Sequence, residues 1–242
     1  MPTRIKAALF DKDGTLIDFT ASWRGLVDHM IAVYAKDDRD LADALGAAIG
    51  YDRATGVFLP GSPIVADTTD VVAHLMAELL PGRSPAEIED DANRRAAAAG
   101  AGDGSGVAPV AGLREAMEAL DAMGVALGVG THDSEAAARI QAKGMGVDHL
   151  IRFYAGYDSG HGLKPGPGMP IAFARASGVD PAEIVMVGDS VHDLCAGRAA
   201  GCAASIGVLT GPATERELEA EADAILPSVA DLPDYLRRVF PA

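Results

Sequence analysis

Three short apolar runs, each ending abruptly in a polar residue, most constrain the fold of this 242-residue chain. They extend from Ile5 to Phe10 before Asp11, from Val125 to Gly130 before Thr131, and from Ile184 to Gly188 before Asp189. Continuous apolar runs of this length are typical of strands buried on both faces of a parallel sheet. The runs therefore predict three strands at the centre of such a sheet.

Weaker strand signals occur at residues 150–155, 203–208 and 224–226. Helical patterns lie between the runs, as in the segment from Pro170 to Ser177 and at the apolar positions Leu113, Met117, Leu120 and Met123. Strands that alternate with helices are typical of an α/β layer fold, so we expect a mostly parallel sheet with helices packed against it.

One segment, from about Ile17 to about Ala108, interrupts this alternation with helical patterns and no convincing strand. It carries two apolar stripes, which we interpret as the core of a helical bundle: Trp23, Leu26, Val27, Met30, Ile31 and Tyr34, and then Val71, Val72, Leu75, Met76 and Leu79. The sequence from Ser84 to Glu87 predicts a capping box that opens a third helix. A glycine-rich hinge at residues 100–106 would lead back to the α/β part. We therefore expect a core of residues 1–16 and 109–242 and an inserted helical cap of residues 17–108.

Charge and apolar patterning exclude several classes of partner. The chain has 20 basic and 35 acidic residues, a formal net charge of −15, so a nucleic-acid partner is not expected. No apolar segment reaches the length of a membrane span, and the run near the N-terminus is too short for a signal peptide. The two cysteines, Cys195 and Cys202, have neither metal-ligand spacing nor the density of a disulfide scaffold. A cytoplasmic protein that binds no membrane is the expectation.

The pentapeptide from Asp11 to Thr15 follows the first predicted strand directly. Because side chains alternate along an extended chain, Asp11 and Asp13 can point to one side, and Lys12 is expected to point away from them. Gly14 allows a tight turn and leaves backbone N–H groups free to meet an anion. The plainer alternative is an Asp-Gly turn after a strand.

A second carboxylate pair follows a different strand, in the sequence from Gly188 to Asp193. Ligands of open α/β sheets bind at the carboxyl ends of the strands, so acids that gather there indicate a site. Carboxylates about 4 Å apart repel by about 4 kcal/mol per pair at an effective dielectric constant near 20. A divalent cation with oxygen ligands, usually Mg²⁺ where a phosphate takes part, would offset this repulsion. Asp193 has an equally good interpretation as a first-turn acid of the next helix.

Thr131 and Lys164 complete the candidate set. Thr131 closes the second strong strand and offers a hydroxyl, while Lys164 offers a cation beside a proline. Either residue alone is more typical of a helix cap or a solvated loop. Their order along the chain gives them weight, because an acid pair, a hydroxyl, a lysine and another acid follow one another.

With these residues the sequence resembles the haloacid dehalogenase superfamily in all four of its motifs. The first motif, Asp-x-Asp-x-Thr, matches Asp11, Asp13 and Thr15. The second, a Ser or Thr that ends a strand, matches Thr131, and the third, a lysine, matches Lys164. The fourth, Gly-Asp-x-x-x-Asp, matches Gly188, Asp189 and Asp193. The segment from Leu163 to Gly211 is further similar to the phosphoglycolate phosphatase-like branch. The likeness covers residues 1–16 and 109–240, and the cap matches in position and helical character only. The expected fold is a Rossmann-like, doubly wound sheet with an inserted helical cap.

The resemblance implies a phosphatase that works through an aspartyl-phosphate. Asp11 would attack the phosphorus atom, and the covalent intermediate would then be cleaved by water. Asp13 would protonate the leaving alcohol and later deprotonate the water. An acid at position 13 sets this chain apart from the dehalogenases and from P-type ATPases of the same superfamily. Lys36 is the single lysine of the cap, which argues against a phosphonate hydrolase with a cap lysine.

The resemblance also implies how the phosphate and a metal ion would be held. Mg²⁺ would bind Asp11, the main-chain carbonyl of Asp13, and Asp189. Thr131, Lys164 and backbone amides near Gly14 would hold the phosphoryl oxygens. The residues expected to support these groups from behind are Thr15, Ser190 and Asp193.

Two features of the sequence concern substrate choice. His132 and Asp133 follow Thr131, where relatives of the phosphoglycolate type usually have Asn. His132 could therefore bind a substrate hydroxyl or carboxylate, or serve only local hydrogen bonds. In the cap, Arg53 and one of Arg94 or Arg95 could bind a second anionic group, although surface arginines are more often solvated.

The expected activity is Mg²⁺-dependent hydrolysis of a small phosphate ester of the phosphoglycolate or sugar phosphate type. One alternative is a phosphomutase that uses the same aspartyl-phosphate. Another is a non-catalytic phosphate-binding regulatory module. The expected partner is a small-molecule phosphate ester, and the chain is expected to be a monomer or a homodimer.

Overall fold

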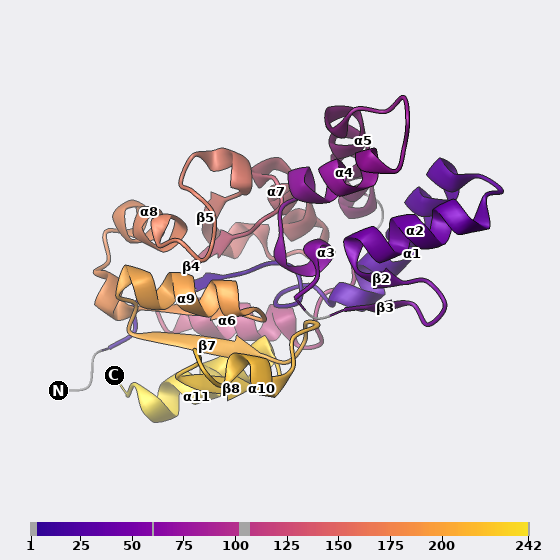
Figure 1. Ribbon diagram of the computed structural model, residues 1–242. Coiled ribbons are helices and arrows are strands. Elements are labelled where there is room, and N and C mark those ends of the chain that lie inside the picture. The colour runs from indigo at the N-terminus through magenta and orange to yellow at the C-terminus, as the bar shows by residue number, and fades with distance from the viewer. Residues whose placement is uncertain (1–3, 60, 102–106, 242) are drawn as a thin grey trace.

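Six parallel strands form the central sheet of the computed structural model, which describes residues 4–59, 61–101 and 107–241 (Figure 1). The strands are β1 (Ala7–Phe10), β4 (Ala126–Gly130), β5 (Ile151–Ala155), β6 (Ile184–Gly188), β7 (Ala204–Val208) and β8 (Ala224–Leu226). All six lie where the three apolar runs and the three weaker signals predict them. Their spatial order is β5-β4-β1-β6-β7-β8, the doubly wound order in which the connections reverse direction at β1.

Both faces of the sheet are buried, which explains why its strands read as continuous apolar runs. On β1, Ala8 and Phe10 pack into one apolar cluster, and Ala7 and Leu9 pack into another on the opposite face. All four side chains have no exposed surface. The mostly parallel, Rossmann-like sheet that we expected is confirmed.

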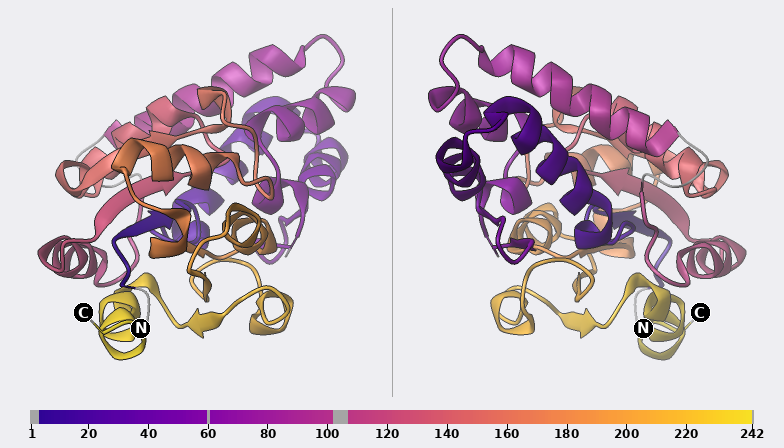
Figure 2. Two further views of the ribbon diagram at one scale, coloured as in Figure 1. Left: turned by 90° about the vertical axis from the view of Figure 1, so that its left-hand side faces the viewer. Right: turned by 90° about the vertical axis from the view of Figure 1, so that its right-hand side faces the viewer.

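Helices cover the two faces of the sheet as separate layers (Figure 2). One face carries α8 (Gly168–Ser177) and α9 (Val191–Ala200), and the other carries α6 (Leu113–Ala122), α7 (Glu135–Gly144) and α11 (Leu232–Val239). The remaining short elements are α10 (Glu215–Leu218) and single 3-10 turns at Asp148–Leu150, Tyr157–Ser159, Pro181–Glu183 and Val229–Asp231. None of the helices in the described ranges combines the length and apolar character needed to cross a membrane.

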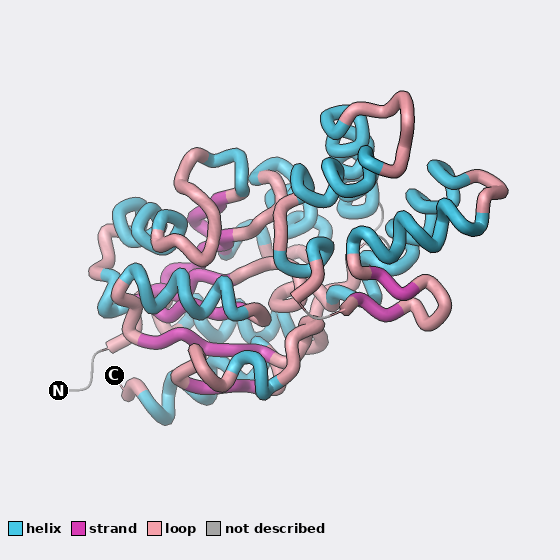
Figure 3. Tube along the Cα trace, viewed as in Figure 1, coloured by secondary structure: helices cyan, strands magenta, loops and turns pink. Residues whose placement is uncertain are grey.

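The cap is mostly helical (Figure 3). It packs around an apolar cluster of its own. Its helices are α1 (Phe19–Ala35), α2 (Arg39–Ile49), α3 (Pro63–Ala66), α4 (Thr69–Glu78) and α5 (Pro85–Ala101). The predicted capping box opens α5, because the Ser84 hydroxyl accepts from the Glu87 N–H and the Glu87 carboxylate accepts from the Ser84 N–H. Of the predicted hinge at residues 100–106, residues 102–106 lie outside the described residues.

The expectation that the cap lacks strands is wrong. A hairpin of β2 (Tyr51–Asp52) and β3 (Val57–Phe58) follows α2. Gly50, in the left-handed conformation, ends α2 and turns the chain into the hairpin. Each strand has two residues, too few to produce a period in the sequence.

Candidate active site

The carboxyl ends of the three central strands are level with one another. Phe10 is paired with Val129 of β4 and with Val187 of β6, and the Asp11 N–H donates to the Val187 carbonyl at 2.8 Å. The residue after each strand therefore emerges at the same edge of the sheet. Thr131, Asp11 and Asp189 lie there, beside the point where the strand order reverses, which is the usual ligand site of such sheets.

Lys164 connects two of the acids at this edge. Its Nζ lies 2.6 Å from Asp11 Oδ1 and 2.5 Å from Asp193 Oδ1, and all three side chains are buried. Burial lowers the pKa of Lys164, but the two carboxylates more than offset this and hold the pKa above its ordinary value. Lys164 is therefore a fixed positive charge beside Asp11.

Asp11, Asp189 and Asp193 form a buried cluster in which one oxygen of each lies within 4.8 Å of the others. Burial raises the pKa of Asp11 to about 7, against the opposing effect of Lys164, and burial also raises the pKa of Asp189. Three carboxylates face a single lysine, so the cluster has an excess of negative charge. Such a set of oxygen ligands could hold a hard divalent cation.

Two glycines leave room for the Asp189 carboxylate. Gly14 lies in a tight turn with φ +81°, and Gly211 approaches from the loop after β7. A Cβ atom at either position would overlap the carboxylate. Thr210, next to Gly211, donates its hydroxyl to the Gly14 carbonyl at 2.6 Å, so the two loops are fastened together.

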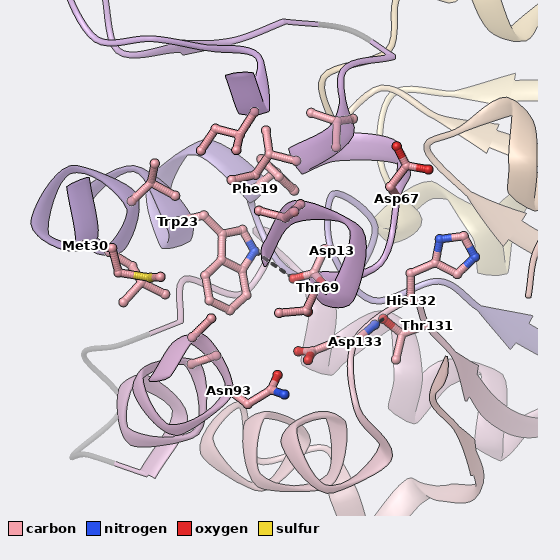
Figure 4. A pocket seen from close by; sticks show the side chains of 18 of the residues that line it. Asp13, Phe19, Trp23, Met30, Asp67, Thr69, Asn93, Thr131, His132 and Asp133 are labelled. Atoms are coloured by element: carbon pink, nitrogen blue, oxygen red, sulfur yellow. Dashed lines mark hydrogen bonds between the residues drawn. The ribbon is translucent and has the colours of Figure 1, made fainter. Parts of the chain in front are cut away.

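The Asp13 carboxylate binds two donors. Trp23 Nε1 of the cap donates to its Oδ1 at 2.7 Å (Figure 4). Lys12 Nζ lies 2.6 Å from its Oδ2. The expectation that Lys12 points away from Asp13 is wrong. The chain leaves the extended conformation at Lys12, whose carbonyl accepts from the Leu16 and Ile17 N–H groups, so the alternation of side chains ends there.

Lys12 is 1% exposed, and its buried charge needs more than one partner. Asp133 is the second, with an Oδ2 3.2 Å from Lys12 Nζ. Burial raises the pKa of Asp133, with Lys12 opposing the shift. The chain of contacts therefore runs from Trp23 through Asp13 and Lys12 to Asp133.

Asp133 and Trp23 are the site residues that sequence reasoning missed. Asp133 was noted only as a departure from the family pattern, and Trp23 was assigned to the cap core. A signal existed for each: an acid two residues beyond a strand at the site edge, and an indole N–H in an apolar stripe, which needs an acceptor when buried.

The other predicted residues lie around this edge. The buried Thr131 hydroxyl accepts from the Asp133 N–H at 3.1 Å, and His132 Nε2 accepts from the Lys164 N–H at 3.1 Å. Behind Asp189, the Thr15 hydroxyl donates to Oδ1 at 3.3 Å. The His132 contact joins the loop after β4 to the Lys164 loop.

Ser190 and Asp193 form a reciprocal capping box at the start of α9. The Ser190 hydroxyl and N–H donate to Asp193 Oδ2 at 2.6 and 3.1 Å. Asp193 Oδ1 meets Lys164, so this first-turn acid of α9 also lies in the acid cluster.

A cavity of about 170 Å³ extends from this edge into the cap (Figure 4). Its core side includes Asp11, Asp13, Thr131, Lys164 and Asp189, and its cap side is mainly apolar. The cap stripe that we interpreted as bundle core is therefore both core and cavity wall. The cap arginines considered as anion ligands do not line it, namely Arg53, Arg94 and Arg95.

Comparisons with known proteins agree with the family resemblance of the sequence motifs. The sequence model of the haloacid dehalogenase-like hydrolase family matches residues 5–201. A phosphoglycolate phosphatase of Rhodospirillum rubrum is 30% identical over 239 residues, which cover 96% of this chain and 90% of the relative. Two solved structures share the fold at 20% identity. A predicted phosphoglycolate phosphatase from Haemophilus somnus has a TM-score of 0.73, and the match covers 96% of this chain and 97% of that chain. A putative β-phosphoglucomutase from Thermotoga maritima has a TM-score of 0.68, and the match covers 97% of this chain and 100% of that chain.

Proposed function

The chain belongs to the haloacid dehalogenase-like hydrolase family and is a phosphoric monoester hydrolase, and we propose that it cleaves a small phosphate ester through an aspartyl-phosphate on Asp11. The observation that carries the proposal is the setting of Asp11. This carboxylate is buried at the end of β1, bound to Lys164 and open to the cavity. A nucleophile for an anionic phosphate needs such a neighbouring cation.

In the first step, a carboxylate oxygen of Asp11 bonds to phosphorus while the bond from phosphorus to the ester oxygen breaks. Asp13 gives its proton to the departing alkoxide, which leaves as the alcohol. Lys164 and the Thr131 hydroxyl neutralise and orient the phosphoryl oxygens, together with backbone N–H groups of the turn. The N–H of Gly14 itself donates to the Ile17 carbonyl at 2.8 Å, so it is not among them.

In the second step, Asp13 takes a proton from a water molecule that attacks the phosphorus. The bond between phosphorus and Asp11 breaks, and inorganic phosphate and the free Asp11 carboxylate result. Asp13 is thereby returned to its protonated form. The cap over the cavity limits the access of other water molecules.

We propose Mg²⁺ as the cofactor, held by Asp11, Asp189 and the main-chain carbonyl of Asp13. The acid cluster supports this assignment, because its negative charge exceeds that of one lysine and its ligands are all oxygens. When bound, the ion would supply the positive charge that reduces repulsion between Asp11 and the substrate.

Phosphate release from a panel of monoesters, with Mg²⁺ and with chelator, tests this function. We expect release that requires Mg²⁺ and falls by at least about 1000-fold in Asp11→Asn, which keeps the shape of the side chain but not the nucleophile. Turnover near the parent rate in Asp11→Asn would contradict the assignment. An isomeric phosphate in place of free phosphate would identify a phosphomutase.

A further inference from the structure

We propose that the substrate of this site carries a small, uncharged, apolar group on its phosphate, such as a short alkyl chain or a single ring. This inference rests on the proposed phosphatase function and names its substrate class. It differs from what the names of the full-length relatives suggest, because phosphoglycolate carries a carboxylate where we expect an apolar group.

The wall of the cavity opposite the acids is apolar. Side chains from α1 and α4 form most of it, among them Phe19, Trp23 and Met30 (Figure 4). Val72 and Met76 of α4 line it as well. The polar groups of the cap that reach the cavity are few, and they belong to Asp67, Thr69 and Asn93. A group that leaves water for such a wall gains free energy only if it is apolar itself.

Within the described residues, the cavity offers no spare counter-charge to a second anion. In the described part of the cap, no Arg, Lys or His side chain lines the cavity. Arg53 is 2.6 Å from Asp43, and Arg95 is 2.9 Å from Asp91, both outside the cavity lining. On the core side, Lys164 is already shared by two acids. His132 also lines the cavity, but its Nε2 already accepts from the Lys164 N–H.

A second anion in the cavity would also meet negatively charged side chains. Asp13 and Asp133 line the core side, and Asp67 lines the cap side. A substrate carboxylate would have to lose water beside three acids and an apolar wall, which disfavours its ionised form. The same surroundings place no penalty on a methyl or methylene group.

The size of the cavity limits the apolar group. Its volume of about 170 Å³ is similar to that of a dry, apolar protein cavity of about 150 Å³ that holds benzene. Because the phosphoryl group occupies the end beside Asp11, about one ring or a chain of about four carbons is the largest group that we expect to fit.

The decisive comparison uses two esters of nearly the same shape. Isobutyl phosphate has a branched apolar end where phosphoglycolate has its carboxylate. In the presence of Mg²⁺ we expect kcat/KM for isobutyl phosphate to exceed that for phosphoglycolate by about tenfold or more. From ethyl to butyl phosphate we expect a rise of about fourfold per methylene group. A flat series, or a preference for phosphoglycolate, would overturn the inference.

Binding gives a second readout that does not depend on turnover. Trp23 is the single tryptophan of the chain and lines the cavity, so its fluorescence reports on ligands there. In Asp11→Asn, we expect isobutyl phosphate to change this fluorescence at a lower concentration than phosphoglycolate does. If no ester is hydrolysed by the parent enzyme but this order holds, the phosphatase proposal fails and the apolar pocket stands. If phosphoglycolate is the better ligand and substrate, the phosphatase stands and the apolar pocket fails.

A pair of variants at Met30 tests the wall itself. Met30→Gln keeps the length of the side chain and makes it polar, whereas Met30→Leu keeps it apolar. We expect the glutamine variant to reduce the preference for isobutyl phosphate about fivefold or more and the leucine variant to retain it. If Met30→Gln fails to fold, Val72→Thr replaces it in the test, because this substitution exchanges a methyl group for a hydroxyl of similar size. We expect it to reduce the preference for isobutyl phosphate as well. Equal preferences in the polar and apolar variants would contradict the proposal.

Discussion

At the scale of single residues, Asp13 differs from the other acids of the site because one of its two donors comes from the cap. Lys12 belongs to the core, whereas Trp23 belongs to the cap. The orientation of the proposed acid and base therefore depends on a side chain 10 residues further along, in another layer of the protein. Trp23 acts on the reaction through Asp13, so its role is one of positioning.

Replacement of Trp23 by Phe keeps an aromatic wall and removes the N–H donor. We expect kcat for alkyl phosphates to fall about tenfold, and kcat for phenyl phosphate to fall less, because phenolate needs less help from an acid. Steady-state kinetics on the two kinds of ester measure the difference. Equal losses on both esters would indicate damage to packing instead of misplacement of Asp13.

The sequence could predict the acids of the site but not their partners. Asp11 and Asp189 follow apolar strands, so their meeting at one edge follows from the parallel sheet. The contact between Trp23 and Asp13 depends on how the cap docks, and the inward turn of Lys12 depends on Asp133. Neither docking nor the pairing of buried charges leaves a periodic signal in the sequence.

Among the elements, the buried strands were the easiest to predict and the short cap hairpin the hardest. The six strands can be recognised in the sequence because burial on both faces requires continuous apolar residues. The hairpin of β2 and β3 is set by its turns and by packing of Tyr51 and Phe58 against each other, with ring centroids 4.8 Å apart. Such a contact is decided in three dimensions.

The start of α9 shows how an element positions a charge. Ser190→Ala removes a helix cap and also one of the donors that hold Asp193 against Lys164. We expect the free energy of unfolding to fall by about 1 kcal/mol and kcat to fall severalfold.

Ser84→Ala is the matched control, because it removes the same kind of capping box from α5, away from the acids. We expect a similar or smaller loss of stability and an unchanged kcat. Urea unfolding and steady-state kinetics measure the two effects. Parent-like kcat in Ser190→Ala would show that the capping box does not position Lys164.

For the whole molecule, the cavity is the place where two separately packed apolar cores meet. The cap cluster and the sheet clusters are distinct, and the acids lie between them. Burial of these acids lowers the free energy of unfolding once they ionise, so the charges of the site destabilise the folded state. Such a loss of stability is expected at a functional site, where residues are placed for the reaction and not for stability.

The pH dependence of global stability should show this cost. The pKa of Asp11 is raised to about 7, and those of Asp133 and Asp189 are also raised. The folded metal-free protein therefore binds these protons more tightly than the unfolded chain does, and its stability should fall as the pH rises from about 5.5 to about 7.5. Carboxylates with lowered pKa, such as Asp91, act in the opposite sense only at lower pH.

Urea unfolding at both pH values, with chelator and with Mg²⁺, measures the effect. We expect Mg²⁺ to reduce the pH dependence, because the cation would stabilise the ionised acids in the folded state alone. Asp189→Asn should reduce it as well, since one of the titrating groups is gone. Stability that is constant or rises with pH in the presence of chelator would show that the buried acids do not oppose folding, and the charge balance inferred for the cluster would then be wrong.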